Sequence, residues 1–205
     1  MITFGDLALD ALTEIFNIGV GSAADLLSQM VRGEKVSLSV PLLRVVPRDQ
    51  LVAALPMPAE QRLCAIRQLF AGPVNTEAIL MFPEDRSREL VRIIVGAGAE
   101  VPLAQITEME QDALGEVGNI ILNSVVAALA DQLALTFDGG LPTVEVCSVA
   151  DLFTAAGRGE AVLLLQIDFD LAERAIHGDM AFILDVASVD ALTRSIDTYL
   201  LSISA

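Results

Sequence analysis

Basic residues are scarce in this chain. Lysine and arginine together number 12 of 205 residues against 28 aspartates and glutamates, the formal net charge is −16, and Lys35 is the single lysine. Nucleic acids and anionic membrane surfaces are bound through clustered lysines and arginines. The composition therefore excludes a nucleic-acid-binding protein and a polybasic membrane anchor.

Histidine and cysteine are rarer still. His177 is the only histidine, and Cys64 and Cys147 are isolated cysteines without a CxxC motif. A zinc site needs a cluster of such ligands, and a lone histidine defines no catalytic constellation. We expect His177 to be a turn residue ahead of a strand. The cysteine usage is that of a chain in a reducing cytoplasm.

Long uncharged segments are also missing, although hydrophobic residues make up 54% of the chain. Residues 117–130 form an uncharged run of fourteen that still contains two asparagines and a serine, whereas a membrane span needs about 20 apolar residues. Residues 1–6 lack the basic region and apolar core of a secretory signal. Disorder is excluded because it requires low hydrophobicity. We therefore expect a cytoplasmic globular protein with a large core and no membrane contact.

The hydrophobic pattern predicts the same order of elements twice: helix, strand, two-strand hairpin, helix. Breaks are expected near residues 97–102 and 138–142. The first set is a helix over 10–28, strands over 36–40, 63–70 and 77–82 with a turn at 72–75, and a helix over 86–95. The second is a helix over 112–130, strands over 143–149, 160–168 and 179–185, and a helix over 189–201.

The two long helices repeat each other at an offset of 102 residues. Residues 10–28 and 112–130 are identical at eight of nineteen positions, including Asp, Glu, Asn and Ser. A half of about 100 residues is marginal as an independent fold. We therefore predict one domain of the α/β (α+β) class over 1–205. It consists of two homologous halves, about 1–103 and 104–205, which share a sheet or pack helix against sheet.

Each repeated helix carries a narrow polar stripe, because residues four and seven apart lie on one helix face. Asparagine is a poor interior helix residue, yet it follows a glutamate by three positions in both stripes. Gly21, one turn after the first asparagine, leaves room for another molecule to approach. The stripes consist of Asp10, Glu14 and Asn17 in the first helix, and of Asp112, Glu116, Asn119 and Asn123 in the second.

A carboxylate and a carboxamide at positions i and i+3 suit a reaction that depends on positioning. The carboxylate can pair with a lysine of another protein. The carboxamide offers one acceptor and two donors, so it can hold a water molecule in a chosen orientation without deprotonating it. Phosphoryl transfer is such a reaction, because its catalysis is mostly alignment and charge stabilisation.

These residues resemble the Asp/Ser-x3-Glu-x2-Asn-x22-Pro pattern of the CheC/CheX/FliY phosphatases of chemotaxis. The second copy matches in full and ends at Pro142. In the first copy Pro41 comes one residue late, which predicts a loop insertion near residues 32–35. The resemblance covers almost the whole chain and implies a pseudo-two-fold fold with the two active helices side by side on a β-sheet.

The resemblance also implies roles for these residues in removing the phosphoryl group from phospho-aspartate in a CheY-type response regulator. Glu14 and Glu116 would pair with the receiver's lysine. Asn17 and Asn119 would orient the attacking water, and Asp10 and Asp112 would support these contacts. Mg²⁺ would belong to the receiver, so that the chain needs no metal or cofactor of its own.

A second hypothesis belongs to a different class of function. The same stripes suit a binding module that holds a receiver domain, or a CheD-like receptor deamidase, with little or no hydrolysis. The presence of both asparagines favours the enzyme, because a protein that only binds has no need of that carboxamide twice. Unequal sites are expected, since the second helix is more apolar beside its stripe.

Overall fold

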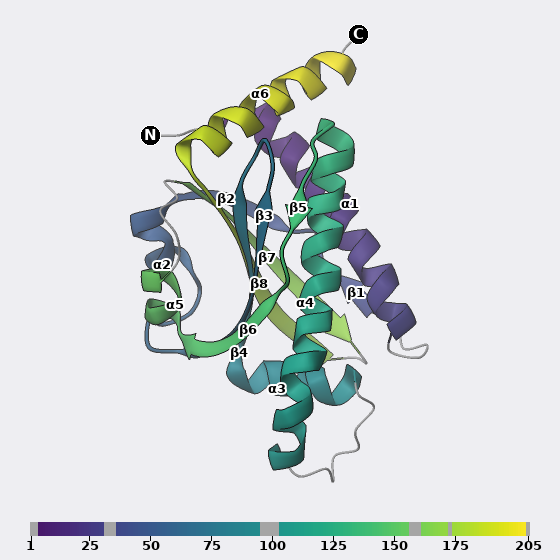
Figure 1. Ribbon diagram of the computed structural model, residues 1–205, viewed down its shortest axis with the longest axis vertical. Coiled ribbons are helices and arrows are strands. Elements are labelled where there is room, and N and C mark those ends of the chain that lie inside the picture. Colours follow the sequence, from purple (N-terminus) through teal and green to yellow (C-terminus); the bar gives the residue numbers. More distant parts are fainter. Residues whose placement is uncertain (1–3, 31–35, 95–102, 156–160, 172–173, 204–205) are drawn as a thin grey trace.

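The protein, in a computed structural model, folds as one antiparallel β-sheet with long helices on one face and short helices on the other (Figure 1). The structure describes residues 4–30, 36–94, 103–155, 161–171 and 174–203. The fold class is therefore α/β (α+β), as the sequence predicts.

Apart from one short 3-10 helix, the same order of elements occurs in residues 4–94 and in residues 103–203. That the two halves are equivalent in space and form a single domain stays a prediction. The first part contains α1 (Asp6–Met30), β1 (Val36–Leu38), β2 (Leu42–Pro47), η1 (Arg48–Gln50), α2 (Leu51–Ala54), β3 (Arg62–Ala71), β4 (Thr76–Pro83) and α3 (Glu84–Ile94). The second contains α4 (Leu103–Leu133), β5 (Asp138–Gly139), β6 (Thr143–Ser148), α5 (Val149–Ala155), β7 (Ala161–Leu171), β8 (Arg174–Leu184) and α6 (Val186–Ile203).

All ten helices and strands expected from the hydrophobic pattern are present, with shifted ends, and several short elements come in addition. β2 directly follows Pro41 and ends at Pro47, and these prolines hide it in the sequence because proline is rare inside strands. The expected break at 138–142 contains the two-residue strand β5. The one at 97–102 lies outside the described residues. Helix α4 begins at Leu103, nine residues before the expected start.

The strands of the two parts of the chain form one sheet. Its order is β1-β7-β8-β4-β3-β5, with β2 also paired with β7 and β6 with β3. In the middle, β4 pairs antiparallel with β8 from Thr76↔Leu184 to Met81↔Asp179. Neither part of the chain therefore has a complete sheet of its own.

Both faces of the central strands are covered, which explains their nearly continuous apolar sequences. On β3, Cys64 and Ile66 face the core beneath α1, α4, α6 and α3. Leu63 and Ala65 face a smaller core beneath α2 and α5. In Figure 1 the two groups of helices lie on opposite sides of the sheet. The long helices that carry the polar stripes thus lie together on one face.

Two helices are long and apolar enough to cross a membrane by length and composition, α1 and residues Gln111–Leu133 of α4. The expectation that no segment reaches this limit is wrong. It considers only runs without any charged residue, whereas a helix can be apolar enough while it includes a charged side chain. A core helix of a soluble protein has the same properties, and both helices here pack on the sheet.

His177 is not a turn residue. It lies within β8, where its backbone is paired with that of Asp168 on β7. The hydrophobic pattern predicts a strand from residue 179 onward, but β8 begins at Arg174. The residue after His177, Gly178, is paired with Ile167 inside the same hairpin.

Candidate functional site

The two helices with polar stripes lie side by side, α1 starting next to α6 and α4 next to α3, so that they run in opposite directions (Figure 1). They approach each other closely at Gly19. A Cβ added there would lie 2.6 Å from the Cα of Val125 and 3.0 Å from the main-chain oxygen of Ser124. Glycine at this position therefore permits direct backbone contact between the helices.

The polar stripe of α1 points away from the core. Asp10 and Glu14 are exposed and Asn17 is half-buried, whereas Leu12 and Phe16 are fully buried. The predicted orientation of this helix is confirmed. Gly21 is also exposed, and a Cβ added to it would have no heavy atom within 4 Å.

The stripe of α4 has the same orientation but is more enclosed. Asp112 and Glu116 are exposed, and Asn119 and Asn123 are half-buried. Of the three flanking apolar side chains that we expected to be covered, Leu122 and Val126 are buried and Ile120 is half-buried. On α1, by contrast, the flanking side chains Ile18 and Leu26 are 46% and 44% exposed.

A groove of about 490 Å³ runs between the two helices. Asn119 and Asn123 line it from α4, and Ile18 and Leu26 line it from α1. Asn17 is not among the lining residues. The structure thus places the carboxamide of the second stripe at a hollow with apolar walls and the carboxamide of the first stripe outside it.

Asn119 is held by hydrogen bonds from its own helix. The Nδ2 atom of Asn123 donates to Oδ1 of Asn119 at 2.8 Å and to the Asn119 main-chain oxygen at 2.7 Å. Gln68 on β3 lies behind this pair, with Nε2 donating to the Gly140 carbonyl at 2.9 Å. Its own carboxamide lies 3.4–3.5 Å from that of Asn123.

Sequence reasoning missed Gln68. It is 3% exposed and the only amide side chain in an otherwise apolar strand face of Cys64, Ile66 and Phe70. A buried polar side chain usually has a specific hydrogen-bond partner, so its place in an apolar strand was an available signal. Its partner on α4, however, lies 55 residues away in sequence.

The two motif prolines occupy matching places in the chain. Pro41 is buried between β1 and β2, and Pro142 is half-buried between β5 and β6. The segment before Pro142 is fixed to β3, because the N–H of Gly140 donates to the Leu69 carbonyl at 2.8 Å. The proline segment is thus connected through Gln68 to Asn123 and Asn119. The expected insertion at 32–35 lies outside the described residues.

The two helices also contact the sheet differently. On α4, Gly118 lies directly against β3, where an added Cβ would be 2.3 Å from Cγ2 of Ile66. At the matching position α1 has Phe16, which stacks on Phe182 of β8 with ring centroids 5.5 Å apart. The residue before Asn119 is therefore a backbone contact, and the residue before Asn17 is a large aromatic side chain.

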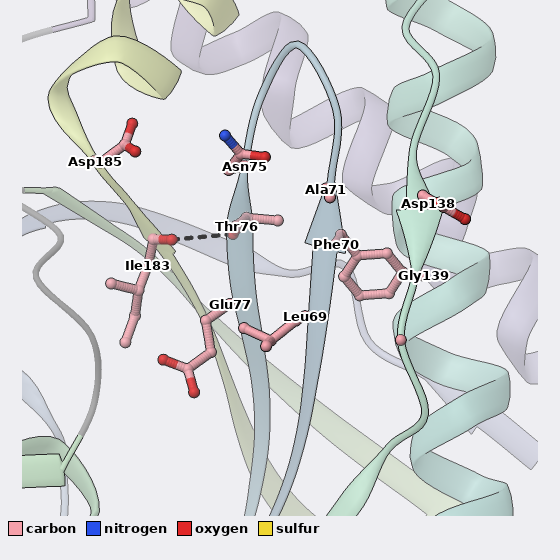
Figure 2. A pocket seen from close by; sticks show the side chains of 11 residues that line it. Leu69, Phe70, Ala71, Asn75, Thr76, Glu77, Asp138, Gly139, Ile183 and Asp185 are labelled. Carbon is pink, nitrogen blue, oxygen red and sulfur yellow. Dashed lines mark hydrogen bonds between the residues drawn. The ribbon is translucent and has the colours of Figure 1, made fainter.

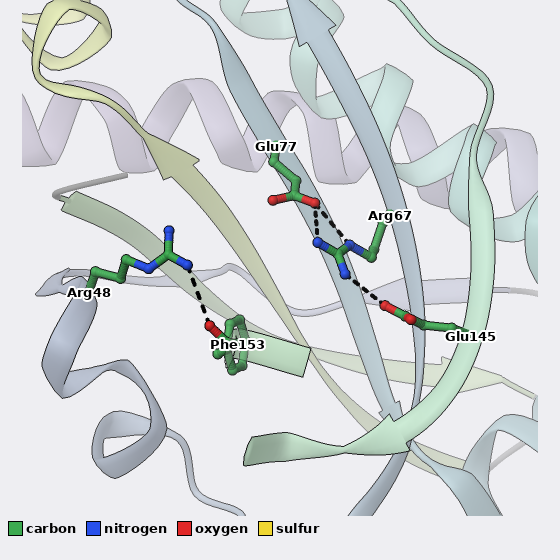
Figure 3. Close-up of polar contacts among 5 residues, drawn as sticks. All are labelled: Arg48, Arg67, Glu77, Glu145 and Phe153. Carbon is green, nitrogen blue, oxygen red and sulfur yellow. Dashed lines mark hydrogen bonds and ion pairs between the residues drawn. The ribbon is translucent and has the colours of Figure 1, made fainter. Parts of the chain in front are cut away.

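A charged cluster lies on the other face of the sheet (Figure 3). Arg67 of β3 is bonded to Glu77 of β4, and its Nη1 donates to Glu145 of β6 at 2.9 Å. Burial alone would lower the pKa of Arg67, but its hydrogen bonds and charge interactions with Glu145 and Glu77 outweigh burial and raise it. The arginine is a permanent cation that joins three strands.

Another hollow, of about 670 Å³, lies at the tip of the β3–β4 hairpin. Figure 2 shows Asn75 and Thr76 on one side and Asp138 and Gly139 on the other. Thr76 donates through Oγ1 to the Ile183 carbonyl at 3.2 Å. None of the residues in the two stripes lines this hollow.

The described side chains give no support to thiol or metal chemistry. Burial, and then the charge of Glu145, raise the pKa of the Cys147 thiol, which keeps it protonated and a poor nucleophile near neutral pH. Within the part of the chain that the structure describes, no group of three or more His, Cys, Asp or Glu residues is placed to hold a metal ion.

Comparisons with known proteins agree with the resemblance seen in the motif. A family model, "CheC-like family", matches residues 7–42. The CheY-P phosphatase CheC of Bacillus subtilis is 26% identical over 184 residues, which are 89% of this chain and 80% of that protein.

Solved structures share the fold. Thermotoga maritima FliY superposes with a TM-score of 0.78 at 18% identity, covering 97% of this chain and 100% of that one. The CheX–CheY–BeF₃–Mg²⁺ complex from Borrelia burgdorferi matches with a TM-score of 0.54 at 18% identity, covering 84% of this chain and 96% of the other. The family match over residues 7–42, the similarity to CheC and the fold shared with FliY all support a relationship to the CheC-type family.

Proposed function

We propose that this chain hydrolyses the phospho-aspartate of a CheY-type response regulator. The observation that carries the proposal is the pair of stripes on adjacent helices, each with an exposed glutamate three residues before a half-buried asparagine. A relative of this chain is named a CheY-P phosphatase, and a protein of the same fold has been solved in complex with CheY, BeF₃ and Mg²⁺.

In this proposal the glutamates hold the receiver. Glu14 and Glu116 are exposed on the same side of their helices as Asp10 and Asp112, so each stripe presents two carboxylates. One of them, the glutamate, pairs with the receiver's active-site lysine, and the aspartate adds to the local negative charge. Opposite charges at an interface steer association and fix its register.

The asparagines act on the water molecule. In-line attack on phosphorus requires a water whose oxygen faces the phosphoryl group, and Asn17 or Asn119 can fix that orientation through hydrogen bonds. Neither amide removes a proton, so the rate gain comes from alignment. The Mg²⁺ that supports the transferring charge is the receiver's, and this chain uses no cofactor of its own. A cytoplasmic location follows from such a substrate.

The test is phosphate release from a CheY-type receiver phosphorylated by acetyl phosphate in Mg²⁺. We expect Asn17→Ala and Asn119→Ala to lose different parts of the activity, and the double variant to fall to the receiver's own rate of dephosphorylation. A double variant that is as active as the wild type would show that the asparagines are not catalytic.

Binding is measured separately from hydrolysis. Glu14→Ala with Glu116→Ala should weaken binding to the receiver, whereas Asp197→Ala, which removes an exposed carboxylate from α6, should leave it unchanged. If the wild type binds the phosphorylated receiver and releases no phosphate, the chain is a binding module. A CheD-like receptor deamidase as a further partner stays a prediction, to be tested by the same binding measurement.

A further inference from the structure

The hydrogen bonds of Asn119 restrict how its carboxamide can turn. Oδ1 accepts from Asn123 Nδ2 at 2.8 Å. If the carboxamide of Asn119 turned by 180°, its NH₂ group would face the NH₂ group of Asn123, and two donors would meet. The orientation with the oxygen toward Asn123 is therefore fixed, and an amide oxygen has a second lone pair left for another donor.

Asn123 itself is held from behind. Gln68 is almost fully buried and its Nε2 donates to the Gly140 carbonyl, which leaves its carboxamide at 3.4–3.5 Å from that of Asn123. Gly139 completes the enclosure, because a Cβ added to it would be 3.5 Å from Oδ1 of Asn123. Two strands and a helix thus determine where the Asn123 side chain lies.

The first stripe has no such support. Gly21 stands where the second helix has Asn123, at the same offset of four residues after the asparagine. Space around Gly21 is open to 4 Å. Among the residues that the structure describes, the Asn17 side chain makes no hydrogen bond. No side-chain hydrogen bond therefore fixes the orientation of its carboxamide.

We infer that Asn123, held by Gln68, is a positioning residue that orients the Asn119 carboxamide toward the groove. The second stripe is consequently a preorganised site, and the first is not. The inference rests on the proposed function for its effect on rate. The remaining lone pair of Asn119 Oδ1 accepts a hydrogen bond from the attacking water, which directs the water's oxygen at the phosphoryl group. Because the carboxamide is already oriented, no rotation is needed before each turnover.

The alternative is that Asn123 only satisfies buried polar groups around Gln68. In that case its replacement would lower stability, and the rate per bound receiver would be unchanged. A positioning role affects kcat more than KM, because an interaction that aligns water is needed in the transition state and adds little to receiver binding. The two roles therefore predict different changes in kcat relative to KM.

The experiment uses the full chain with Asn17→Ala, so that hydrolysis depends on the second stripe. Into it we introduce Asn123→Gly, which copies the first helix, and Asn123→Asp, which keeps the size but removes the donor. We expect kcat to fall about tenfold or more in both, with KM for the phosphorylated receiver nearly unchanged. Ala130→Gly is the control, because it weakens α4 at least as much through helix propensity but at a residue that does not line the groove.

A second measurement does not depend on activity. ¹⁵N relaxation of the side-chain NH₂ groups should show Asn119 ordered and Asn17 mobile in the wild type, and Asn123→Gly should make Asn119 as mobile as Asn17. If Asn119 is as mobile as Asn17 in the wild type, or if Asn123→Gly retains full kcat, the inference is wrong. Failure of the proposed function looks different: hydrolysis is then absent or unaffected by the double asparagine variant, and the relaxation data alone decide the positioning.

Discussion

Gly19 of α1 lies against the backbone of Val125 of α4, so that a Cβ on Gly19 would come within 2.6 Å of the Val125 Cα. This is backbone against backbone, which no change of rotamer relieves. The distance between the two helices is therefore set at this point, and with it the width of the groove at Asn119.

Gly19→Ala should separate the helices. Alanine is the better helix former by about 1 kcal/mol, but overpacking a close contact costs about 1–3 kcal/mol, so we expect a net loss of stability. Urea unfolding followed by circular dichroism measures it through the midpoint at constant m-value. An unchanged or higher midpoint would show that the helices shift apart at no cost.

Gly21→Ala on the same helix is expected to have the opposite effect on stability. The position is open, so only the helix propensity changes, and the free energy of unfolding should rise by up to about 1 kcal/mol. If a receiver approaches Asn17 closely, the added methyl group should also weaken binding at the first stripe. Isothermal titration with the receiver in an Asn119→Ala background measures this; equal affinity would argue against close approach.

Asp185 caps the N-terminus of α6, because its Oδ1 accepts from the N–H of Ser188 at 2.7 Å. This backbone hydrogen bond, followed by one with the Ser188 side chain, lowers the pKa of Asp185 below its ordinary 3.8. The ionised form is favoured in the folded state, so the stabilisation is present above pH ~4 and is lost as the pH falls through the lowered pKa.

Asp185→Ala should therefore reduce stability at neutral pH by about 1 kcal/mol, the usual effect of losing such a cap. The difference from the wild type should shrink below pH ~4. Asp185→Asn keeps an acceptor and should retain most of the stability at neutral pH. Urea midpoints between pH 3 and 7 test this, and a difference that stays constant over this range would contradict the capping role.

Arg67→Met should destabilise the sheet. The arginine joins Glu77 and Glu145 across three strands, and its loss removes both ion pairs. Hydrogen bonds to charged groups contribute about 1.5–3 kcal/mol each at most. We expect a net loss of about 1–3 kcal/mol, less than the sum of the bonds, because the side chains are partly solvated. Urea unfolding of Arg67→Met and of the wild type gives the difference in their free energies of unfolding.

Arg86→Met is its matched control. Arg86 bonds to Glu89 on the same helix, but its side chain is 51% exposed, and such pairs contribute about 0.5 kcal/mol or less. If the two variants lose equal stability, the three-strand cluster contributes no more than a surface ion pair.

Helix periodicity was sufficient to orient the site helices. Polar residues at Asp10, Glu14 and Asn17 alternate with apolar ones at Leu12 and Phe16, and a helix can bury only one of these faces. The same argument gave the second helix. Sequence alone therefore located both stripes and their exposure, because these depend on local geometry.

Contacts between distant parts of the chain could not be predicted from the sequence. The contact of Gln68 with Asn123 depends on β3 passing beneath α4, which no local pattern specifies. The preference of Asn119 for the groove has the same origin, since Gly118 sets α4 against Ile66 of β3. The strand order, with β4 beside β8, is likewise fixed by the packing of distant segments.

The β4–β8 pairing also determines how folding depends on concentration. A chain ending after α3 would leave the edge of β4 open and could complete this sheet only by associating with a second molecule. Because β8 is supplied by the same chain, closure of the sheet is intramolecular, and its stability does not change on dilution. Each molecule therefore carries one copy of both stripes, whatever the protein concentration.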